Sequence, residues 1–586
     1  MKDESGSIPF ATPLSRWAIP LLLALFAAGL LTIMPNYHAY FFGDEHFYTD
    51  SAMRMDQTGQ LLAPTYSDGS LRFNKPVLSY WMILSGFRLF GTSVLSSRIA
   101  SLLAGLVILL LTRLLAIRLF KSQTAGWLAM LVLASNIELI AAAMRATPDI
   151  FLCLFSLLSL YGFAGLLLGE HRPADAWLAY VGAGLAIASK GMLGVLLLLF
   201  VFLFAVSRGD RAARLRALLR PLPMLACLVL GLSWFVAVYL KYGDLALHGF
   251  LHDQVGNRVS SSAGGVLTNL FQYSLGLAVP FFPWSVLLIA GLIAGRPLLA
   301  RVRREQADSF TFVFAWYALV LFIFSPANLT RTRYLLPAFP LLAAGLAALL
   351  PALLEHPAVS RLARRILQVL AAVLLVLAAG FLLMALGLER PRLIAAAAGF
   401  LLMAAILILG LRRGGPSAPP ALLALATFVI LWDVHFLVRP AFPSTPSYEM
   451  VGALQQAGVK RVFFPLQELE TMTHEEVSLY KEKYASQVRL ISGGTIRVDR
   501  LKLDTYLARE KSVVPMICVG DDVHLFPSTR FTAVRAGAVY KSGIGPAEVR
   551  HILTAADKPA TLETLYIPYY IVYPKKDQPT ERTPAP

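Results

Sequence analysis

Long apolar runs dominate this chain of 586 residues and decide what it can fold into. A helix needs roughly 20 apolar residues to cross about 30 Å of hydrocarbon, and most of the runs reach that length. Hydrophobic residues make up 57% of the chain and charged residues 15%. A chain of this composition has more apolar surface than a soluble fold can bury. We therefore predict a mostly α-helical, polytopic membrane protein with about 13 transmembrane helices, at about 17–36, 96–120, 124–143, 149–168, 177–189, 191–207, 222–240, 274–295, 309–325, 333–353, 362–387, 391–411 and 420–438.

Basic residues in the connections between the runs give the helices a direction. Arg and Lys gather in every second connection, and the positive-inside rule places such connections in the cytoplasm. The alternation holds only if 177–189 and 191–207, which Lys190 and Gly191 separate, are two spans; one broken helix is the alternative. We predict an N-terminus inside and a C-terminus outside, from the basic sets Arg113, Arg118 and Lys121; Arg172; Arg208, Arg211, Arg214, Arg216 and Arg220; Arg296, Arg301, Arg303 and Arg304; Arg361, Arg364 and Arg365; Arg412 and Arg413.

The net charge of +17 belongs almost entirely to the apolar part of the chain. Residues 1–440 carry 34 basic and 19 acidic side chains, whereas residues 441–586 carry 18 and 16. The excess therefore reflects topology and does not indicate a nucleic-acid-binding face. The cysteines Cys153, Cys227 and Cys518 are far apart and predict no disulfide framework.

The chain divides into a transmembrane domain, residues 1–440, and a tail, residues 441–586. The transmembrane domain has two long outer loops, 37–95 and 241–273. The tail alternates strand-like and helical patterns and predicts a small periplasmic α/β domain with a disordered C-terminal end at 577–586. The expected strands are Val459–Pro465, Val488–Ser492, Ser512–Val519 and Leu565–Tyr573, and the expected helix is His474–Tyr484.

Carboxylates stand at the outer ends of two different spans. The first outer loop opens with Gly43-Asp44-Glu45-His46, and Asp149 lies in the first turn of the run 149–168. Carboxylates at this depth need a partner, a cation or a reaction, so Asp44, Asp149 and Glu45 are candidate catalytic residues. A solvated loop or helix capping is the alternative for each.

Basic and aromatic side chains accompany these carboxylates on the outer side. Cations converging at the membrane surface suit a phosphate or pyrophosphate, whereas anchoring to lipid headgroups is the alternative. For Lys190 we favour snorkelling toward the interface over a role in the site. The candidate substrate- and phosphate-binding residues are Lys75, Arg258, Arg333, Tyr334, Arg331 and Tyr80.

Metal binding has little support in the sequence. His248 and His252 are spaced to share a helix face, and His46 follows two carboxylates, but no third ligand stands at a metal-like spacing. His252 and His46 are therefore weak candidates, no cofactor is indicated firmly, and a divalent cation is the one candidate.

Short motifs resemble those of a known family. Gly43-Asp44-Glu45, followed by Phe73-Asn74-Lys75-Pro76-Val77-Leu78-Ser79-Tyr80-Trp81, resembles the first outer loop of bacterial GT-C glycosyltransferases. Tyr334-Leu335-Leu336-Pro337 is similar to a segment before a late span of that family. The similarity extends over about residues 15–440 and is strongest to protein-mannosyltransferase-like enzymes and to the lipid A aminoarabinose transferase.

This resemblance implies an activity and roles for particular residues. It implies transfer of a sugar from a polyprenyl-phosphate carrier to lipid A, another envelope glycan or a protein, at the periplasmic face of the bacterial inner membrane. Asp44 and Asp149 match the acidic positions. Lys75 matches a lysine that contacts the carrier phosphate, Tyr334 matches a tyrosine near it, and Arg258 resembles the arginine of the long loop after the seventh span.

Two departures from the family stand in the first outer loop. Asn74 replaces a glutamate that helps to hold a metal in aminoarabinose transferases. Phe47 replaces an arginine three residues after the first aspartate, and Arg54 is the candidate substitute.

Other classes of protein remain open at this point. A protein O-mannosyltransferase-like enzyme would use the same carrier, and thirteen spans also suit a lipid-linked sugar transporter or flippase. Transporters place charges near the bilayer midplane and often contain inverted repeats, whereas this chain has its candidate groups at the outer ends of spans. A scaffold that binds partners through its tail is a third alternative.

Overall fold

We analysed a computed structural model of the chain. It describes residues 15–33, 44–66, 69–169, 171–207, 209–245, 250, 263–294, 304–326, 331–388, 391–413, 418–434, 448–466, 485–508, 514–519, 523–524, 526–540 and 566–575.

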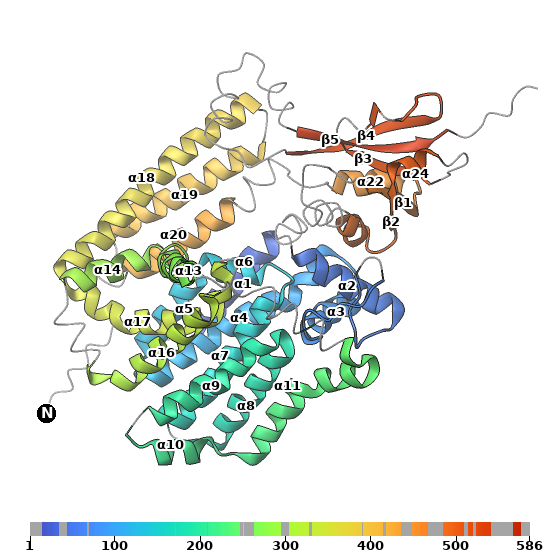
Figure 1. Cartoon of the computed structure of the whole chain (residues 1–586). Coiled ribbons are helices and arrows are strands. Elements are labelled where there is room, and N and C mark those ends of the chain that lie inside the picture. Colours follow the sequence, from blue (N-terminus) through green and yellow to red (C-terminus); the bar gives the residue numbers. More distant parts are fainter. Residues whose placement is uncertain are drawn as a thin grey trace, which may run out of the picture.

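The described residues form a bundle of helices with a small sheet domain at one end (Figure 1). The helices of the bundle are α1 (Ser15–Ile33), α2 (Glu45–Thr58), α3 (Leu78–Phe90), α4 (Val94–Phe120), α5 (Gln123–Ala134), α6 (Ile137–Ala143), α7 (Pro148–Leu168), α8 (Pro173–Lys190), α9 (Met192–Val206), α10 (Arg211–Leu218), α11 (Pro221–Tyr242), α13 (Ala263–Gly276), α14 (Trp284–Ala294), α16 (Ala307–Phe324), the 3-10 helix η2 (Thr332–Ala338), α17 (Phe339–Glu355), α18 (Pro357–Leu388), α19 (Pro391–Arg413) and α20 (Ala418–Asp433).

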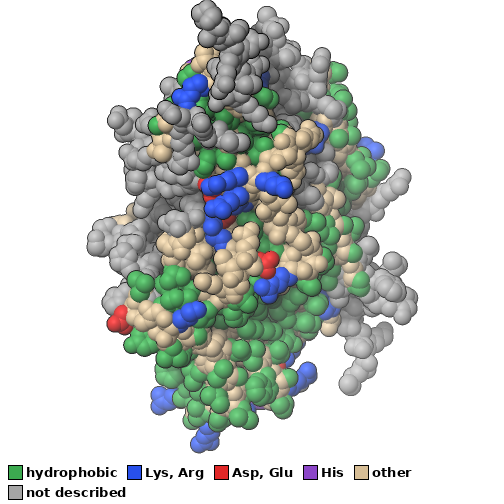
Figure 2. Space-filling model, turned by 90° about the vertical axis from the view of Figure 1, so that its right-hand side faces the viewer, with side chains coloured by type: hydrophobic (Ala, Val, Ile, Leu, Met, Phe, Trp, Pro, Cys, Tyr) green, Lys and Arg blue, Asp and Glu red, His purple; other side chains and the backbone are tan. Residues whose placement is uncertain are grey.

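Seven of the described helical segments are long and apolar enough to cross a membrane, and there are eight if α5 and α6, which are bent by 68° at their break, count as one span. Every one of the thirteen predicted apolar runs overlaps a helix, which supports the expectation of a mostly α-helical membrane protein. The number of spans stays a prediction. The lower part of the molecule in Figure 2 is covered by hydrophobic side chains, as a surface in contact with lipid requires.

Residues 177–207 fold as two separate helices, α8 and α9, and not as one broken helix. Gly191 joins them with φ 72° and ψ −125°, a conformation that favours glycine. A Cβ built on Gly194 would approach the backbone nitrogen of Ile187 to 2.4 Å, so the two helices touch at glycine. This reversal leaves Lys190 at the end of α8, beside the start of α7.

The first outer loop folds into two helices and a short hairpin. Helices α2 and α3 lie side by side near the tail domain (Figure 1), and an isolated bridge between Thr65 and Leu71 closes the connection between them. Their apolar side chains form a core of their own, which includes Tyr48, Phe73 and Tyr80. This core gives the residues before α2 and α3 a rigid support.

The tail is a mixed sheet with helices, as the alternating patterns predict. The strands are β1 (Arg461–Leu466), β2 (Arg497–Lys502), β3 (Met516–Val519), β4 (Phe531–Tyr540) and β5 (Tyr566–Pro574), and the short helices are α22 (Tyr448–Gln456) and α24 (Leu503–Leu507). The strand order is β2-β1-β3-β5-β4, with β1 parallel to β2 and β3, and with β5 antiparallel to β3 and β4.

Three of the four predicted strands exist, as β1, β3 and β5, and the fourth prediction is wrong. Residues 485–491 are helical, including most of the expected strand Val488–Ser492. Val488 packs in the core of the tail, Leu490 packs in the core of α2 and α3, and Ile491 touches both. The alternation of apolar residues therefore reflects a helix between two cores. The predicted helix at 474–484 and the predicted disordered end at 577–586 lie outside the described residues.

Candidate functional site

Asp44 stands at the start of α2 and pairs with Arg333 of η2. The carboxylate accepts a hydrogen bond from the Arg333 guanidinium, with Nη2 and Oδ2 2.8 Å apart. The Asp44 side chain is 52% exposed, whereas that of Arg333 is 15% exposed. Asp44 makes no side-chain cap hydrogen bond to α2, so capping does not explain this residue.

Asp149, in the first turn of α7, pairs with Lys190 at the end of α8. The Lys190 Nζ lies 2.5 Å from Asp149 Oδ1, and both side chains are buried. Our preference for a snorkelling Lys190 is therefore wrong, because the reversal at Gly191 turns its ammonium group toward α7. Arg333 and Lys75 also interact electrostatically with Asp149, and Arg333 thereby links the two carboxylates.

An aromatic ring lies beneath these cations. The Tyr334 ring is 5.2 Å from Lys190 Nζ and 5.5 Å from the Arg333 guanidinium carbon. It stacks on Phe324 with ring centroids 5.2 Å apart. The preceding Arg331 donates its backbone N–H to the hydroxyl oxygen of Tyr273 at 3.2 Å, which holds the start of η2 against α13.

Lys75 and Tyr80 are buried at the start of α3. The Lys75 side chain comes from the turn before α3 and is near Asp149, as its electrostatic interaction shows. The Tyr80 ring lies 5.4 Å from that of Tyr48. The structure therefore brings together Asp44, Asp149, Lys75, Arg333 and Tyr334 at one end of the bundle, although they come from α7, η2 and the segments before α2 and α3.

Glu45 and His46 are turned into the protein. Arg98 of α4 donates to both carboxylate oxygens of Glu45, at 2.7 Å and 2.9 Å, and Oε1 also accepts the Ala146 N–H at 2.9 Å. The His46 ring packs against Phe47 with centroids 3.9 Å apart. A catalytic role for Glu45 stays a prediction, and its contacts are those of a residue that ties α2 to α4 and to the connection between α6 and α7.

The described residues do not fit the metal site that the resemblance to aminoarabinose transferases implies. In the described parts of the chain, no three His, Cys, Asp or Glu side chains come together as a metal site. Asn74 stands at the position of the family's metal-binding glutamate, and its Oδ1 accepts from the Tyr66 hydroxyl at 3.2 Å. His252 and Arg258 lie outside the described residues.

Sequence reasoning missed Arg98 and undervalued Lys190. Both are basic residues at the ends of apolar runs, and such residues are seldom buried without a carboxylate partner. This rule indicates that each of them has a carboxylate partner. The partners Glu45 and Asp149 are 53 and 41 residues away in sequence, so the rule does not identify them.

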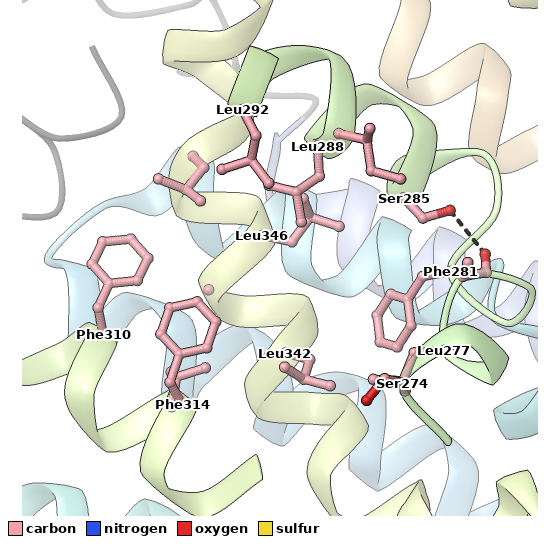
Figure 3. A pocket seen from close by; sticks show the side chains of 15 residues that line it. Ser274, Leu277, Phe281, Ser285, Leu288, Leu292, Phe310, Phe314, Leu342 and Leu346 are labelled. Carbon is pink, nitrogen blue, oxygen red and sulfur yellow. Dashed lines mark hydrogen bonds between the residues drawn. The ribbon is translucent and has the colours of Figure 1, made fainter. Parts of the chain in front are cut away.

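An apolar cavity of about 540 Å³ opens between α13, α14, α16 and α17 (Figure 3). Phe281, Leu342 and Phe314 point into it, and Ser274 lies at one edge. Ser274 follows Tyr273, which holds Arg331, so the cavity lies next to the start of η2.

The chain is similar to several known proteins. Residues 74–240 match a family model described as dolichyl-phosphate-mannose-protein mannosyltransferase. An uncharacterised protein of Aquifex aeolicus is 29% identical over 53% of this chain and 59% of its own length. An undecaprenyl phosphate-α-4-amino-4-deoxy-L-arabinose arabinosyl transferase of Pseudomonas fluorescens is 31% identical over 55% of this chain and 57% of its own length.

A solved structure is similar over nearly the whole chain. The crystal structure of ArnT from Cupriavidus metallidurans, solved alone and bound to undecaprenyl phosphate, has a TM-score of 0.65 and 18% identity, covering 96% of this chain and 98% of that one. The chain spans less than two thirds of the length of the curated relatives that it matches. Because it is similar to the ArnT structure over nearly its whole length, the chain has the GT-C fold, and within that fold it resembles the aminoarabinose transferases.

Proposed function

We propose that the protein is a glycosyltransferase that moves a sugar from a polyprenyl-phosphate carrier to lipid A or another envelope glycan. The observation that carries this proposal is the meeting of Asp44 and Asp149 with Arg333, Lys190 and Lys75 at one end of the bundle. The Pseudomonas fluorescens relative named above is an undecaprenyl phosphate-α-4-amino-4-deoxy-L-arabinose arabinosyl transferase, so this donor is the first to test.

The cations suit the leaving group of this reaction. When the bond between the anomeric carbon and the phosphate oxygen breaks, negative charge grows on the departing carrier phosphate. Positioned cations stabilise such charge well where water is scarce. Arg333 and Lys75 are the groups we assign to it, because Arg333 reaches the more exposed carboxylate Asp44 whereas Lys190 is held by the buried Asp149.

The carboxylates suit the other half of the reaction. The anomeric carbon becomes positively charged as the phosphate leaves, and the acceptor oxygen forms the new bond to it. An acceptor hydroxyl would give its proton to Asp44, the more exposed carboxylate. An acceptor phosphate is already ionised, and Asp44 would then orient the sugar.

The apolar cavity offers a place for the carrier chain. Its lining is almost wholly hydrophobic, and it begins beside the helix η2 that carries Arg333. We infer that isoprene units of the carrier lie there while the phosphate reaches the cations.

The site and the tail lie on the periplasmic side in this proposal. Thirteen spans with a cytoplasmic N-terminus put the start of α7, the end of α8 and residues 441–586 on that side of the bacterial inner membrane. Figure 2 shows Lys and Arg side chains with a few Asp and Glu at mid-height, above the hydrophobic surface, and further Lys and Arg side chains at the lower edge.

A transfer assay tests the proposal. The purified protein in detergent is given undecaprenyl phosphate carrying labelled aminoarabinose, with lipid A as acceptor. Labelled lipid A and released undecaprenyl phosphate in equal amounts are expected. Movement of the label across reconstituted vesicles without transfer would favour the flippase alternative, and neither activity would favour the scaffold.

Protein O-mannosylation is the second candidate, because the matching family model carries that description. The same assay with polyprenyl-phosphate mannose and a peptide acceptor tests it. Mass spectrometry of lipid A and of envelope proteins from a deletion strain separates the two, since only one of them would lose its sugar.

A further inference from the structure

Arg72 occupies an aromatic pocket between α2 and the start of α3. Its guanidinium carbon lies 4.5 Å from the ring centre of Phe47, 5.3 Å from that of Tyr48 and 5.1 Å from that of Tyr66. The residue is 6% exposed, and its backbone N–H donates to the Pro64 oxygen at 2.8 Å. The side chain is therefore held in one place by the rings around it.

This guanidinium lacks the carboxylate that a buried arginine normally needs. Among the residues that the structure describes, no Asp or Glu is in a salt bridge with Arg72, and its buried Nε has no hydrogen-bond partner. Its electrostatic neighbours are the hydroxyls of Tyr80, Tyr48 and Tyr66. A buried charge without a counter-ion is costly, so an anion supplied from outside would satisfy it.

The other arginines of this region are already engaged. Arg54 donates to Asp50 at 3.1 Å, Arg88 donates to Asp56 at 2.9 Å, and Arg98 is bound to Glu45. Arg54 is thus committed to a neighbour on its own helix. Arg72, which lies directly on the ring of Phe47, differs from these three in having no carboxylate partner among the described residues.

The position of Arg72 relates it to the catalytic candidates. Tyr48, which borders the guanidinium, also interacts electrostatically with Asp44 and Asp149. Lys75 follows Arg72 by three residues and interacts with Asp149. Arg72 and Lys75 therefore belong to the same loop, and Tyr48 lies between the Arg72 guanidinium and the carboxylate pair.

We propose that Arg72 is a further substrate-binding residue, which binds a phosphate group in this site. The inference rests on the proposed function, which supplies two phosphates: that of the polyprenyl carrier and that of a phosphorylated glycolipid acceptor. A planar guanidinium presents a fork of N–H donors to phosphate oxygens, and stacked rings fix the plane of the fork. Neither the resemblance nor the comparisons assign this role to Arg72.

Binding measurements on the full-length protein in detergent test the proposal and separate the two phosphates. One arm titrates undecaprenyl phosphate without sugar, and the other titrates lipid A with and without its phosphates. The variants are Arg72→Met and Arg72→Gln, and the matched control is Arg88→Met, which removes an exposed arginine of α3 outside the site.

Loss of a charge-assisted contact should weaken binding by about 10- to 100-fold. We expect this loss for one of the two phosphate ligands in both variants, with unchanged binding of dephosphorylated lipid A and wild-type affinities in Arg88→Met. Wild-type affinity for both phosphate ligands in a folded Arg72 variant would overturn the proposal; Arg72→Gln decides if Arg72→Met does not fold. Turnover by the wild-type protein, measured separately, reports on the proposed function, so the two can fail independently.

Discussion

The two acidic residues of the site, Asp44 and Asp149, have different surroundings, and from this difference we infer different roles. Asp149 is buried and bound to Lys190, so its charge holds cations in place. Asp44 is half exposed and reaches Arg333 from the rim. A substrate that entered the site would meet Asp44 first, which makes Asp44 the stronger candidate for direct action on the acceptor.

We expect Asp44→Asn to lower the turnover number by about 10²- to 10⁴-fold while the protein still inserts and folds. The amide keeps the shape of the side chain but can neither accept a proton nor carry charge. Transfer kinetics with labelled donor and an unfolding curve in detergent measure the two properties. Asp56→Asn is the control, because Asp56 pairs with Arg88 on the surface of α2 and α3. Near-normal turnover by Asp44→Asn would remove this residue from the mechanism.

We expect Lys75→Ala to weaken the binding of undecaprenyl phosphate by about 10- to 100-fold, because a buried cation next to Asp149 is lost. Titration of the carrier against the purified variant measures the change. Replacement of Lys121, a basic residue of the predicted cytoplasmic side, is the comparison. Unchanged carrier affinity in Lys75→Ala would refute its role with the phosphate.

The helix at residues 485–491 connects the tail to the outer helices of the bundle. Arg489 donates to Asp50 of α2 at 2.7 Å, and Asp50 also accepts from Arg54. Burial alone would raise the pKa of Asp50, but Arg489 and Arg54 hold the pKa of this carboxyl below its ordinary value. The tail thereby rests on α2, the helix that begins at Glu45 directly after Asp44.

The lowered pKa gives this contact a definite pH dependence. A carboxyl with a depressed folded pKa contributes its full stability above the unfolded value of about 3.9, and the contribution disappears as the pH falls through the folded value. We expect the tail to stay docked from pH 7 to about pH 4 and to loosen below. Spin labels at Gln57→Cys and Gly452→Cys measure the separation.

Arg489→Met should loosen the tail already at pH 7, by leaving Asp50 with only Arg54. Arg461→Met, which removes an exposed arginine paired with Asp499 on the sheet, is the matched control. An unchanged label distance in Arg489→Met would show that Leu490 and Ile491 hold the tail without the ion pair.

Local sequence patterns predicted the helices and strands of this protein better than the contacts between residues far apart in the chain. The apolar runs, the acidic start of α7 and the strands β1, β3 and β5 follow from residues close in sequence. The pairs Glu45 with Arg98 and Asp50 with Arg489 join residues 53 and 439 positions apart, and no local pattern encodes them. Arg72 was missed for the same reason, because Phe47 and Tyr48 surround it from another helix.

At the scale of the whole molecule, the charged site and the apolar surface occupy different zones. Large hydrophobic side chains are exposed along α11 and α18, among them Leu225, Leu232, Val236, Val369, Val376 and Leu383. The paired charges of the site stand where α7 begins and α8 ends. This arrangement is the one expected of a protein that receives a lipid from the bilayer and reacts with its headgroup at the surface.

The predicted side of the membrane on which each connection lies can be measured. With thirteen spans, a membrane-impermeant maleimide added to spheroplasts should label Gln60→Cys and Gly452→Cys. It should label Gly209→Cys, in the connection between α9 and α10, only after permeabilisation. Labelling of Gly209→Cys in intact spheroplasts would contradict the predicted direction of the helices.

The contact between Asp50 and Arg489 has a consequence for biosynthesis. A ribosome that adds about 5–20 residues per second makes Asp50 roughly 20–90 s before Arg489, because 439 positions separate the two. Throughout that interval the apolar face of α2 and α3 that later receives Leu490 is uncovered in the nascent chain. The surface that α2, α3 and the tail share is therefore completed only after Arg489 has been made, and until then a chaperone has an open face to bind.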